Sequence, residues 1–508
     1  METTWQNLSD PIFHHAETRP DAPAVIDGPS TLSYRELAAL IAKTTVYLRD
    51  LGIGEGDRIG LALTNSADHI ILAFALWRIG ATLAELSVED KPEALATTAA
   101  RYGIGTVFTE AHAAAPPGLR RIRVDLDWRA RMARFSGDHR SAAAGADLLV
   151  IMLTTGSTGI PRAWTVSHRG FMDAAEMREA WWLASGWDSA REPGHFLLMN
   201  SLRYCWFQTL LVLQVRAGAP LVLLPEYAKP ADMLRAIAGW RDAVAYVTAN
   251  ICRYMLSVAP ASGELLPNVR WLESGGLPLY PEEKQAMVAR VTPRFNETYG
   301  STGGGFISAL SACDMMAKPD TVGRPPPRVE VQIVDPGGRP VPVGTAGELR
   351  CRPLWALPFG GQDVVTGGER IVDRWCYTAD VGFFDADGYI HLRGRGADVI
   401  RRGAVEIFAP EIEAVLAAHP AVAEAAVIGL RRPGQTEREE IVAFIVKRSE
   451  FDHADLVRHC RDRLPPAQRP DRVYYADMLP RIAGGKLNRI RLEELAAKAE
   501  ERQPGRRS

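Results

Sequence analysis

The feature that most constrains the fold is the alternation of apolar runs with helical patterns along most of the chain. Residues 31–50 open with Ser33 and Glu36 at the spacing of a capping box and continue with apolar residues at helical intervals. Residues 54–66 predict a turn and a short strand, 67–81 a second helix, and 147–153 and 219–224 buried strands. Strands that alternate with helices form βαβ units, so we predict an α/β fold with largely parallel sheets.

Chain length predicts more than one domain. A single hydrophobic core stops growing beyond roughly 250–300 residues, and this chain has 508. From about residue 395 the pattern becomes α+β. Residues 409–419 predict a helix with Pro410 near its start, where the missing N–H costs nothing. Two predicted strands follow at residues 422–430 and 440–448, and a second helix at residues 454–464. We therefore predict a large N-terminal domain of βαβ-type sheets with flanking helices over residues 1–394, and a small, mobile C-terminal domain over 395–508.

Composition excludes several classes of protein. Lys and Arg (59) nearly balance Asp and Glu (61) and are interspersed with them, so no electrostatic footprint for nucleic acid is expected. The six cysteines are scattered without a CxxC pair, which argues against a zinc ribbon or a disulfide scaffold and favours a reducing compartment. The sequence has no 18-residue uncharged apolar run and no apolar signal core at its start. We expect a cytoplasmic monomer or homodimer without membrane insertion.

One loop has the composition of a phosphate-binding segment. Residues 153–162, LTTGSTGIPR, follow a predicted strand, carry four hydroxyl side chains and two glycines, and end in Arg162. Backbone N–H groups freed by glycine, together with hydroxyls, can surround phosphate oxygens, while arginine supplies positive charge. The loop is not a Walker loop, because GxxxxGK[ST] is absent and no helix is predicted directly after it. Taken alone, it could equally be an ordinary turn after a strand.

This loop resembles the signature loop of the adenylate-forming superfamily, which contains acyl-CoA synthetases, adenylation domains of peptide synthetases and luciferases. Further segments resemble that superfamily's motifs in the expected order: ESGGLPL (273–279), TYGSTG (298–303), VGRPPP (322–327), GELR (347–350), WCYTADVGFFDADGY (375–389), GRGADVIRRGAVEIFAPEIE (394–413) and PRIAGGKLNRIRL (480–492). The resemblance covers about residues 12–495 and is strongest to a stand-alone acyl-CoA synthetase. It implies that a carboxylate is joined to the α-phosphate of ATP with release of pyrophosphate, and that the acyl group then passes to a thiol.

The resemblance also implies roles for individual residues. Lys486 would bridge the carboxylate and the α-phosphate, Thr302 would hydrogen-bond that phosphate, and Arg162 would add positive charge, so these three form the expected catalytic set. Asp380 would accept the ribose hydroxyls and Tyr299 would stack on adenine. The full set expected to bind the nucleotide and coenzyme A comprises Thr154, Thr155, Gly156, Ser157, Thr158, Gly159, Gly275, Gly276, Glu297, Thr298, Tyr299, Gly300, Asp380, Arg395 and Gly403.

The same resemblance predicts a moving C-terminal domain. In the superfamily this domain rotates between the two half-reactions, and the hinge position falls on Ala397, with Asp398 beside it. Gly403 would then face the pantetheine of coenzyme A. We expect ATP, Mg²⁺ and coenzyme A as cofactors, although the residues that hold the metal cannot be assigned.

Two positions depart from the superfamily pattern. Arg162 replaces a lysine, which keeps the charge but offers a planar fork in place of a point charge. Gly303 stands where the superfamily has a glutamate associated with magnesium, and glycine has no ligand atom. Gly303 therefore indicates either weakened metal binding or an enlarged acyl pocket, and we favour the pocket.

The resemblance places the acyl pocket between residues 200–210, ESGGLPL and TYGSTGGG. The candidate pocket residues are Arg203, Tyr204, Trp206, Gly275, Gly303 and Gly304. The histidine common in acyl-CoA synthetases and the aspartate that grips an α-amine are both absent, which argues against an α-amino acid. The glycines predict a bulky or polycyclic acid. As alternatives, Tyr204, Trp206 and Phe207 would be core residues, and Arg203 would meet a second carboxylate of the acid.

Three functions remain open at this point. The first is an ATP-dependent ligase that joins a small-molecule carboxylic acid to coenzyme A. The second keeps the adenylation step and loads the phosphopantetheine of a separate carrier protein. The third is a relative that binds nucleotide or acyl ligand without catalysis, which the substitutions at Arg162 and Gly303 would favour.

Overall fold

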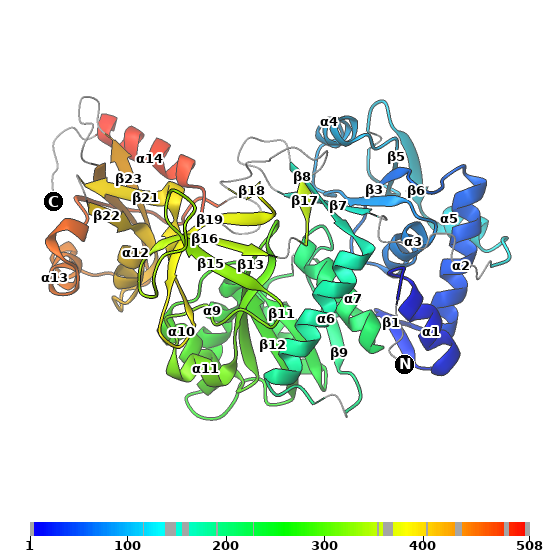
Figure 1. Ribbon diagram of the computed structural model, residues 1–508, viewed down its shortest axis with the longest axis horizontal. Coiled ribbons are helices and arrows are strands. Elements are labelled where there is room, and N and C mark those ends of the chain that lie inside the picture. The colour runs from blue at the N-terminus through cyan, green and yellow to red at the C-terminus, as the bar shows by residue number, and fades with distance from the viewer. Residues whose placement is uncertain are drawn as a thin grey trace. The chain divides into compact units, whose positions relative to one another are not determined.

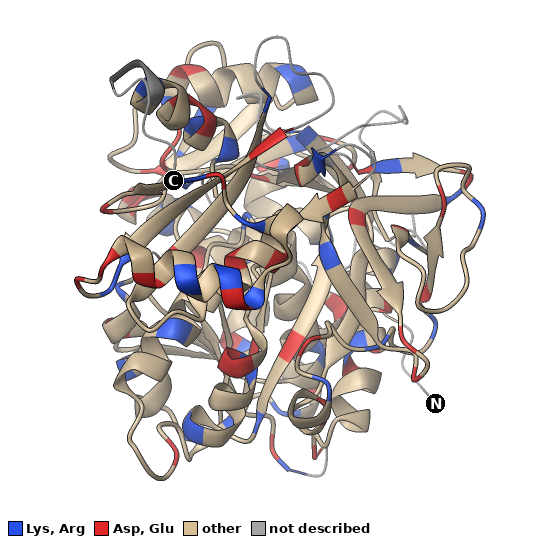
Figure 2. Cartoon of the chain, turned by 90° about the vertical axis from the view of Figure 1, so that its left-hand side faces the viewer, with Lys and Arg blue, Asp and Glu red and all other residues tan. Residues whose placement is uncertain are grey.

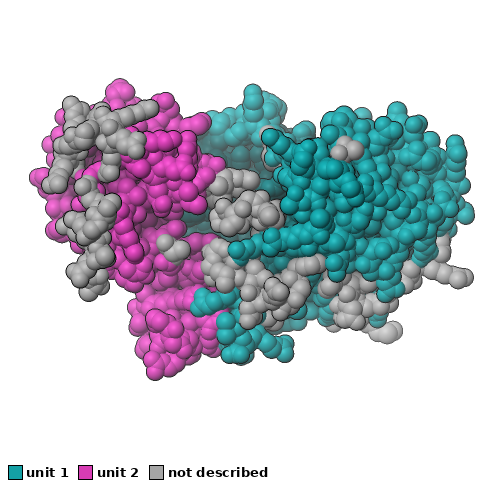
Figure 3. Space-filling view, turned by 90° about the horizontal axis from the view of Figure 1, so that it is seen from above, with its two compact units in different colours: residues 1–331, 351–376 teal, residues 332–350, 377–508 magenta. Residues whose placement is uncertain are grey.

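The computed structural model describes residues 5–114, 116–137, 149–154, 162–188, 191–226, 228–352, 355–358, 369–402, 405–431, 439–481 and 487–502. The chain divides into two compact units, which Figure 3 colours separately. Unit 1 comprises residues 1–331 and 351–376, and unit 2 comprises 332–350 and 377–508. Residues 332–350 and 377–394 thus group with the C-terminal part of the chain, and the expected domain boundary at 394/395 stays a prediction.

Unit 1 contains an eight-stranded sheet whose order is β14-β13-β12-β11-β9-β10-β1-β2. The neighbours from β1 through β13 pair in parallel, and only β2 and β14 at the two edges are antiparallel. Its strands are β1 (Pro23–Asp27), β2 (Ser30–Ser33), β9 (His195–Leu198), β10 (Leu221–Leu223), β11 (Ala243–Val247), β12 (Val269–Gly275), β13 (Phe295–Ser301) and β14 (Gly305–Leu310).

A second, seven-stranded sheet of unit 1 has the order β17-β8-β7-β4-β3-β5-β6. Strands β3 to β7 pair in parallel, and β8 is antiparallel to both of its neighbours. These strands are β3 (Arg58–Ala62), β4 (Thr82–Glu85), β5 (Thr106–Glu110), β6 (Arg120–Val124), β7 (Leu149–Thr154), β8 (Arg162–Ser167) and β17 (Leu357–Pro358).

The helices of unit 1 cover both sheets, and α6 and α7 lie side by side between them (Figure 1). The largest buried core joins Phe171 of α6 and Leu211 of α7 to Phe196 of β9 and Met152 of β7. The helices are α1 (Asp10–Thr18), α2 (Tyr34–Asp50), α3 (Ala67–Arg78), α4 (Pro92–Tyr102), α5 (Leu126–Met132), α6 (His168–Ala184), α7 (Cys205–Ala217), α8 (Pro230–Gly239), α9 (Ala249–Val258), α10 (Pro281–Ala286) and α11 (Ala312–Ala317), with a π-turn, η1 (Met287–Val291), after α10.

Five further strands form a sheet of order β15-β16-β19-β18, with β20 paired to β19, and the boundary between the two units falls within this sheet. Unit 2 continues with a β21-β22 hairpin and a three-stranded sheet, β23-β24-β25. The bounds are β15 (Glu330–Val334), β16 (Gly347–Arg352), β18 (Arg370–Val372), β19 (Trp375–Phe384), β20 (Ile390–Arg395), η2 (Gly396–Asp398), β21 (Val399–Arg402), β22 (Val405–Phe408), α12 (Ala409–Ala417), β23 (Val422–Arg431), β24 (Glu439–Lys447), α13 (His453–Arg463), η3 (Pro466–Gln468), β25 (Arg472–Tyr475) and α14 (Arg489–Arg502). Figure 2 shows basic and acidic residues interspersed along the chain. One ion pair joins Arg393 and Glu411.

The predicted elements are confirmed where the structure describes them. Ser33 caps α2, and its backbone N–H donates to the Glu36 carboxylate at 2.8 Å, so the capping box forms. The strands predicted at 147–153 and 219–224 correspond to β7 and β10, and Pro410 lies in the first turn of α12. Within the described residues, no helix is both long and apolar enough to span a bilayer.

Candidate active site

The predicted phosphate loop joins two antiparallel strands. Thr154 ends β7 and lies opposite Arg162, the first residue of β8. The backbone of Thr154 and the whole of half-buried Arg162 are described. The loop residues Thr155, Gly156, Ser157, Thr158 and Gly159 lie outside the described residues, so their contact with phosphate stays a prediction.

Two of the predicted motifs meet at the carboxyl ends of parallel strands β12 and β13. Gly275 lies opposite Thr298 in the ladder, and a Cβ on Gly275 would lie 2.5 Å from the Thr298 carbonyl oxygen. A side chain at Gly275 would therefore push the two strands apart. Tyr299 and Gly300 continue β13, and both are half-buried. Carboxyl ends of parallel strands are where open α/β sheets bind their ligands, so this edge is the candidate site of unit 1.

Trp206 of α7 adds an aromatic wall to this edge. The indole is half-buried, its ring lies 5.7 Å from the ring of Tyr246 on β11, and its Cζ3 atom is 3.3 Å from the position of a Cβ on Gly300. The Tyr246 hydroxyl in turn lies 2.7 Å from the position of a Cβ on Gly275. The structure thus brings together the three segments expected to line the acyl pocket. Phe207, by contrast, is buried in the core against Tyr246.

A buried ion pair stands behind that wall. Arg178 of α6 donates a short hydrogen bond from Nη1 to Oε1 of Glu273 on β12, and both side chains are almost fully buried. The guanidinium lies 4.0 Å from the ring centre of Trp206 and 4.7 Å from that of Phe306. The sequence analysis missed this pair. Its signal was weak, because Arg178 lies among charged helix residues and 95 positions from its partner.

The Glu273 carboxylate is unusually well supplied with donors. Besides Arg178, the Thr298 hydroxyl donates to Oε1 at 3.1 Å, and two indole N–H groups donate to Oε2, from Trp271 at 3.1 Å and Trp182 at 3.3 Å. A buried carboxylate is tolerated when its lone pairs are satisfied in this way. Glu273 therefore connects the helix behind Trp206 with the strand that carries Tyr299.

The glycine run after Thr302 does not open a pocket, which corrects the sequence-based expectation. A Cβ on Gly303 would lie 2.6 Å from Cη2 of Trp164, and a Cβ on Gly304 would lie 2.7 Å from Sγ of Cys351. Gly303 and Gly304 are buried, and Trp164 is fully buried. Protein side chains already fill the space that the missing side chains leave, so these glycines provide no evidence for a bulky acid.

The side chains of Glu297 and Thr298 also have partners within the protein. Lys284 of α10 forms an ion pair with Glu297 at 2.5 Å, with both side chains about 5–6% exposed. Thr298 donates to Glu273. Both side chains thus have partners within the protein, and the expectation that these two residues contact the nucleotide stays a prediction. Thr302 is half-buried, and its carbonyl oxygen accepts a hydrogen bond from Trp355 at 2.8 Å.

Unit 2 carries the residues expected to bind ribose. Asp380 of β19 lies opposite Arg395 of β20, and Arg395 Nε is 3.4 Å from an Asp380 carboxylate oxygen. The Asp380 side chain is 14% exposed, so its oxygens can still reach a ligand. Ala379, directly before it, has φ 63°, in the left-handed region that favours glycine. The two predicted ribose residues are therefore neighbours.

The predicted hinge lies in a single 3₁₀ turn, η2, between β20 and β21. Asp398 forms an ion pair at 3.1 Å with Arg489 of α14, while Ala397 is described for its backbone only. Lys486 and Gly403 lie outside the described residues, so their roles stay predictions.

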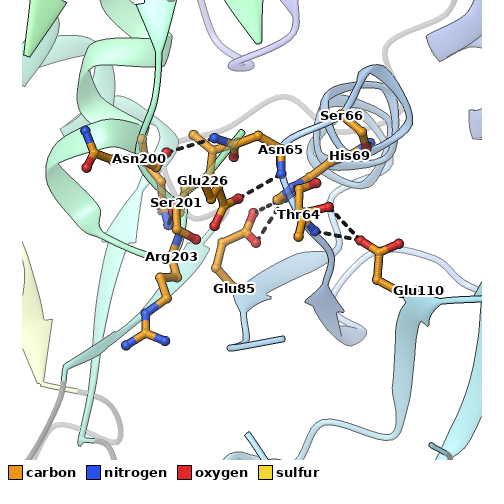
Figure 4. A network of polar contacts seen from close by, with 12 residues as sticks. Thr64, Asn65, Ser66, His69, Glu85, Glu110, Asn200, Ser201, Arg203 and Glu226 are labelled. Carbon is orange, nitrogen blue, oxygen red and sulfur yellow. Dashed lines mark hydrogen bonds and ion pairs between the residues drawn. The ribbon is translucent and has the colours of Figure 1, made fainter. Parts of the chain in front are cut away.

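Arg203 belongs to a different polar network (Figure 4). Its centre is a buried pair in which both Glu85 oxygens lie 3.0 Å from His69 Nε2, and the Asn65 N–H donates to Glu226 at 2.7 Å. The Arg203 side chain points away from both carboxylates, with its guanidinium 4.9 Å from the ring of its neighbour Tyr204. A contact of Arg203 with a second carboxylate of the acid stays a prediction.

The structure gives no protein-based metal site in the part of the chain that it describes. No cluster of three or more His, Cys, Asp or Glu residues there could hold a metal ion. Gly303 contributes no ligand atom, and Trp164 fills the adjacent space.

The architecture of unit 1, with two parallel sheets around α6 and α7 and motif residues at the strand ends, is that of an adenylate-forming enzyme. Comparison with known families agrees with this class. The family model described as AMP-binding enzyme matches residues 12–354, and the model of the AMP-binding enzyme C-terminal domain matches residues 411–486. The chain belongs to the AMP-binding enzyme family.

Individual proteins resemble the chain over nearly its whole length. It is 26% identical to 4-coumarate–CoA ligase 5 of Oryza sativa subsp. japonica, over 95% of this chain and 93% of that protein. It is also 26% identical to fatty acid–[acyl-carrier-protein] ligase ScoC of Streptomyces coeruleorubidus, over 96% of each. Among solved structures, o-succinylbenzoate CoA synthetase from Bacillus subtilis in complex with its acyl-adenylate intermediate superposes with a TM-score of 0.82 at 21% identity, covering 97% of this chain and 98% of that one. At this identity the likeness establishes the fold.

Proposed function

We propose that the protein activates a small-molecule carboxylic acid with ATP to an acyl-adenylate, releasing pyrophosphate, and then transfers the acyl group to coenzyme A. Membership in the AMP-binding enzyme family supports the adenylation step. The similarity to a protein named 4-coumarate–CoA ligase supports a carboxylic acid as substrate and coenzyme A as the thiol that accepts the acyl group. The similarity to a solved CoA synthetase with a bound acyl-adenylate supports the same two assignments. The observation that carries the proposal is the meeting of ESGG, TYG and Trp206 at the carboxyl edge of one sheet.

The chemistry requires positive charge and oriented donors where two anions approach a phosphorus atom. In this proposal Arg162 and the loop that precedes it hold the outer phosphates, and Thr302 donates to the α-phosphate. Lys486 would stabilise the charge that develops between carboxylate and phosphate. Asp380 would accept the two ribose hydroxyls, for which a carboxylate is the natural acceptor.

The expected cofactors are ATP, Mg²⁺ and coenzyme A. A bound nucleotide would supply the metal's main oxygen ligands, because Mg²⁺ is commonly held by substrate phosphates and water with few protein carboxylates. Gly303 is consistent with such an arrangement, since it removes one possible ligand. We assign no step to a residue-bound metal.

Exchange of pyrophosphate into ATP over a panel of carboxylic acids tests the adenylation step. We expect exchange with at least one acid and its loss in Lys486→Ala. The same variant should still form thioester from preformed acyl-AMP and coenzyme A. Absence of exchange with every acid would refute the proposal and favour a protein that binds nucleotide or acyl ligand without catalysis.

A second candidate acceptor is the phosphopantetheine of a carrier protein. This acceptor is supported by the similarity to a ligase named for an acyl carrier protein. That ligase is 26% identical to this chain, the same identity as the CoA ligase of Oryza sativa subsp. japonica. Both acceptors present the same thiol. Incubating the acyl-adenylate with coenzyme A in one arm and with a pantetheinylated carrier protein in the other distinguishes them by which thioester forms.

A further inference from the structure

The ion pair behind Trp206 has contacts that go beyond structural support. The Cζ atom of the Arg178 guanidinium lies over two aromatic rings, 4.0 Å from the ring centre of Trp206 and 4.7 Å from that of Phe306. A guanidinium stacked on an indole is attracted to its π-electrons, and the attraction grows when the pair is shielded from water. Arg178 is fully buried. The position of the Trp206 ring is therefore held from behind by a cation.

Glu273 fixes Arg178 in that position. Their hydrogen bond uses Nη1 of the arginine, whereas Nε and Nη2 have no hydrogen-bond partner in the described part of the chain. Among the residues that the structure describes, Glu273 forms the ion pair with this guanidinium and supplies its compensating charge. Loss of Glu273 would leave a buried cation free to reorient, and Trp206 would lose its fixed support.

Trp206 is the member of this cluster that a ligand can reach. Its side chain is half-buried, unlike Arg178, Glu273 and Phe306. It borders Gly300, one residue after Tyr299, and so lies beside the predicted adenine position. The exposed part of this indole is a flat surface, and the backbone of Gly300 beside it carries no side chain. Flat aromatic surfaces pair best with other aromatic rings, in stacked or edge-to-face geometry.

We propose that Arg178 is a positioning residue for the acid. Held by Glu273, it fixes the indole of Trp206, and that indole contacts the ring of a planar aromatic carboxylic acid. This inference rests on the function proposed above and narrows its substrate class. A planar aromatic acid replaces the bulky polycyclic acid expected from the sequence, because Trp164 and Cys351 occupy the space beside the glycine run that suggested the polycyclic acid.

The test compares aromatic with aliphatic acids in the full-length protein. Pyrophosphate exchange is measured with benzoate, trans-cinnamate and decanoate, and KM is determined separately for each acid and for ATP. The wild type should favour the aromatic acids. Arg178→Met combined with Glu273→Gln removes both charges together, so no buried ion is left unpaired. This variant should raise KM for the aromatic acids by about tenfold, the order expected for a shielded cation–π contact, with little change for decanoate or ATP.

Two further variants separate positioning from stability. Arg178→Lys keeps the charge beside Glu273 but loses the planar face, so it should fold and still show the higher aromatic KM. A matched control is His69→Gln combined with Glu85→Gln, which removes another buried pair of unit 1 with side chains 1% and 4% exposed. The control should leave the ratio of aromatic to aliphatic acid use unchanged.

The outcomes are distinct. An unchanged ratio in a folded Arg178→Met/Glu273→Gln protein overturns the inference, and so does an equal rise in KM for ATP and all acids, which would mean that the pair only braces the fold. A wild type that prefers decanoate also overturns it while leaving the adenylation proposal intact. Absence of exchange with every acid refutes the proposed function itself.

Discussion

Gly303 offers a quantitative test of how unit 1 is packed. A Cβ at this position would lie 2.6 Å from Cη2 and 2.9 Å from Cζ3 of Trp164, and 3.0 Å from Sγ of Cys376. Distances below 3.0 Å force neighbours to move, and overpacking a core costs about 1–3 kcal/mol. Gly303→Ala should therefore destabilise unit 1 by about 1–3 kcal/mol. Gly303→Glu should cost more, because it also buries an unpaired carboxylate.

Trp164→Phe removes the two ring atoms that the new Cβ would meet. The double variant Trp164→Phe/Gly303→Ala should therefore be more stable than the sum of the single changes by about 0.5–3 kcal/mol, the usual coupling between residues in contact. Tryptophan fluorescence during urea unfolding measures each variant. Gly239→Ala serves as the control, since nothing lies within 4 Å of its Cβ position.

Additive effects, or a stable Gly303→Ala protein, would refute the packing argument. The same variants address the metal. With space restored by Trp164→Phe, Gly303→Glu should lower the Mg²⁺ concentration needed for pyrophosphate exchange if this position approaches the metal. An unchanged requirement would show that the absence of glutamate here has no bearing on metal binding.

Three further predictions follow from buried charges and backbone geometry. Burial lowers the pKa of His69, but the charge of Glu85 and the hydrogen bond to Glu85 outweigh burial and raise that pKa above 6.5. The protonated imidazole therefore contributes its full stabilisation below pH 6.5. This stabilisation is lost as pH rises through the folded-state pKa. His69→Gln should abolish this slope in urea titrations across pH and cost about 3–5 kcal/mol, because Glu85 stays buried without its partner. Ala379→Gly should stabilise the protein by up to about 1 kcal/mol, since φ is 63° there; a lower unfolding midpoint would contradict this. Arg178→Met alone should cost about 3–5 kcal/mol, and adding Glu273→Gln should restore most of it, as measured by thermal unfolding.

Local patterns in the sequence were sufficient to predict much of the fold. The capping box at Ser33 and the apolar runs that became β7 and β10 depend on neighbours within a few residues. The Arg178–Glu273 pair depends on two elements 95 residues apart. Residues 176–182, EMREAWW, read equally well as a solvated helix face.

The error at Gly303 has the same physical origin. A glycine in place of a glutamate indicates free volume only if nothing else fills it, and the side chain that fills it, Trp164, lies 139 positions earlier in the chain (303 − 164). Sequence reasoning treated the position in isolation. Packing is decided by all neighbours together, and the sequence does not reveal which distant residue will be one of them.

The four donors that converge on Glu273 have a consequence for how acid preference can change in evolution. A substitution at Arg178 or Glu273 would leave a buried charge unpaired and also remove the support of Trp206, so it would lower stability and change acid use at the same time. Selection removes variants that fall below the stability needed for function, so it acts against such changes whatever acid they would admit. The described contacts of the Trp206 ring, with Arg178, Tyr246 and Phe306, include no ion pair of its own, so replacing this side chain leaves the buried charges paired. We expect lineages descended from this protein to acquire new acids through substitutions at Trp206, while the buried pair behind it persists.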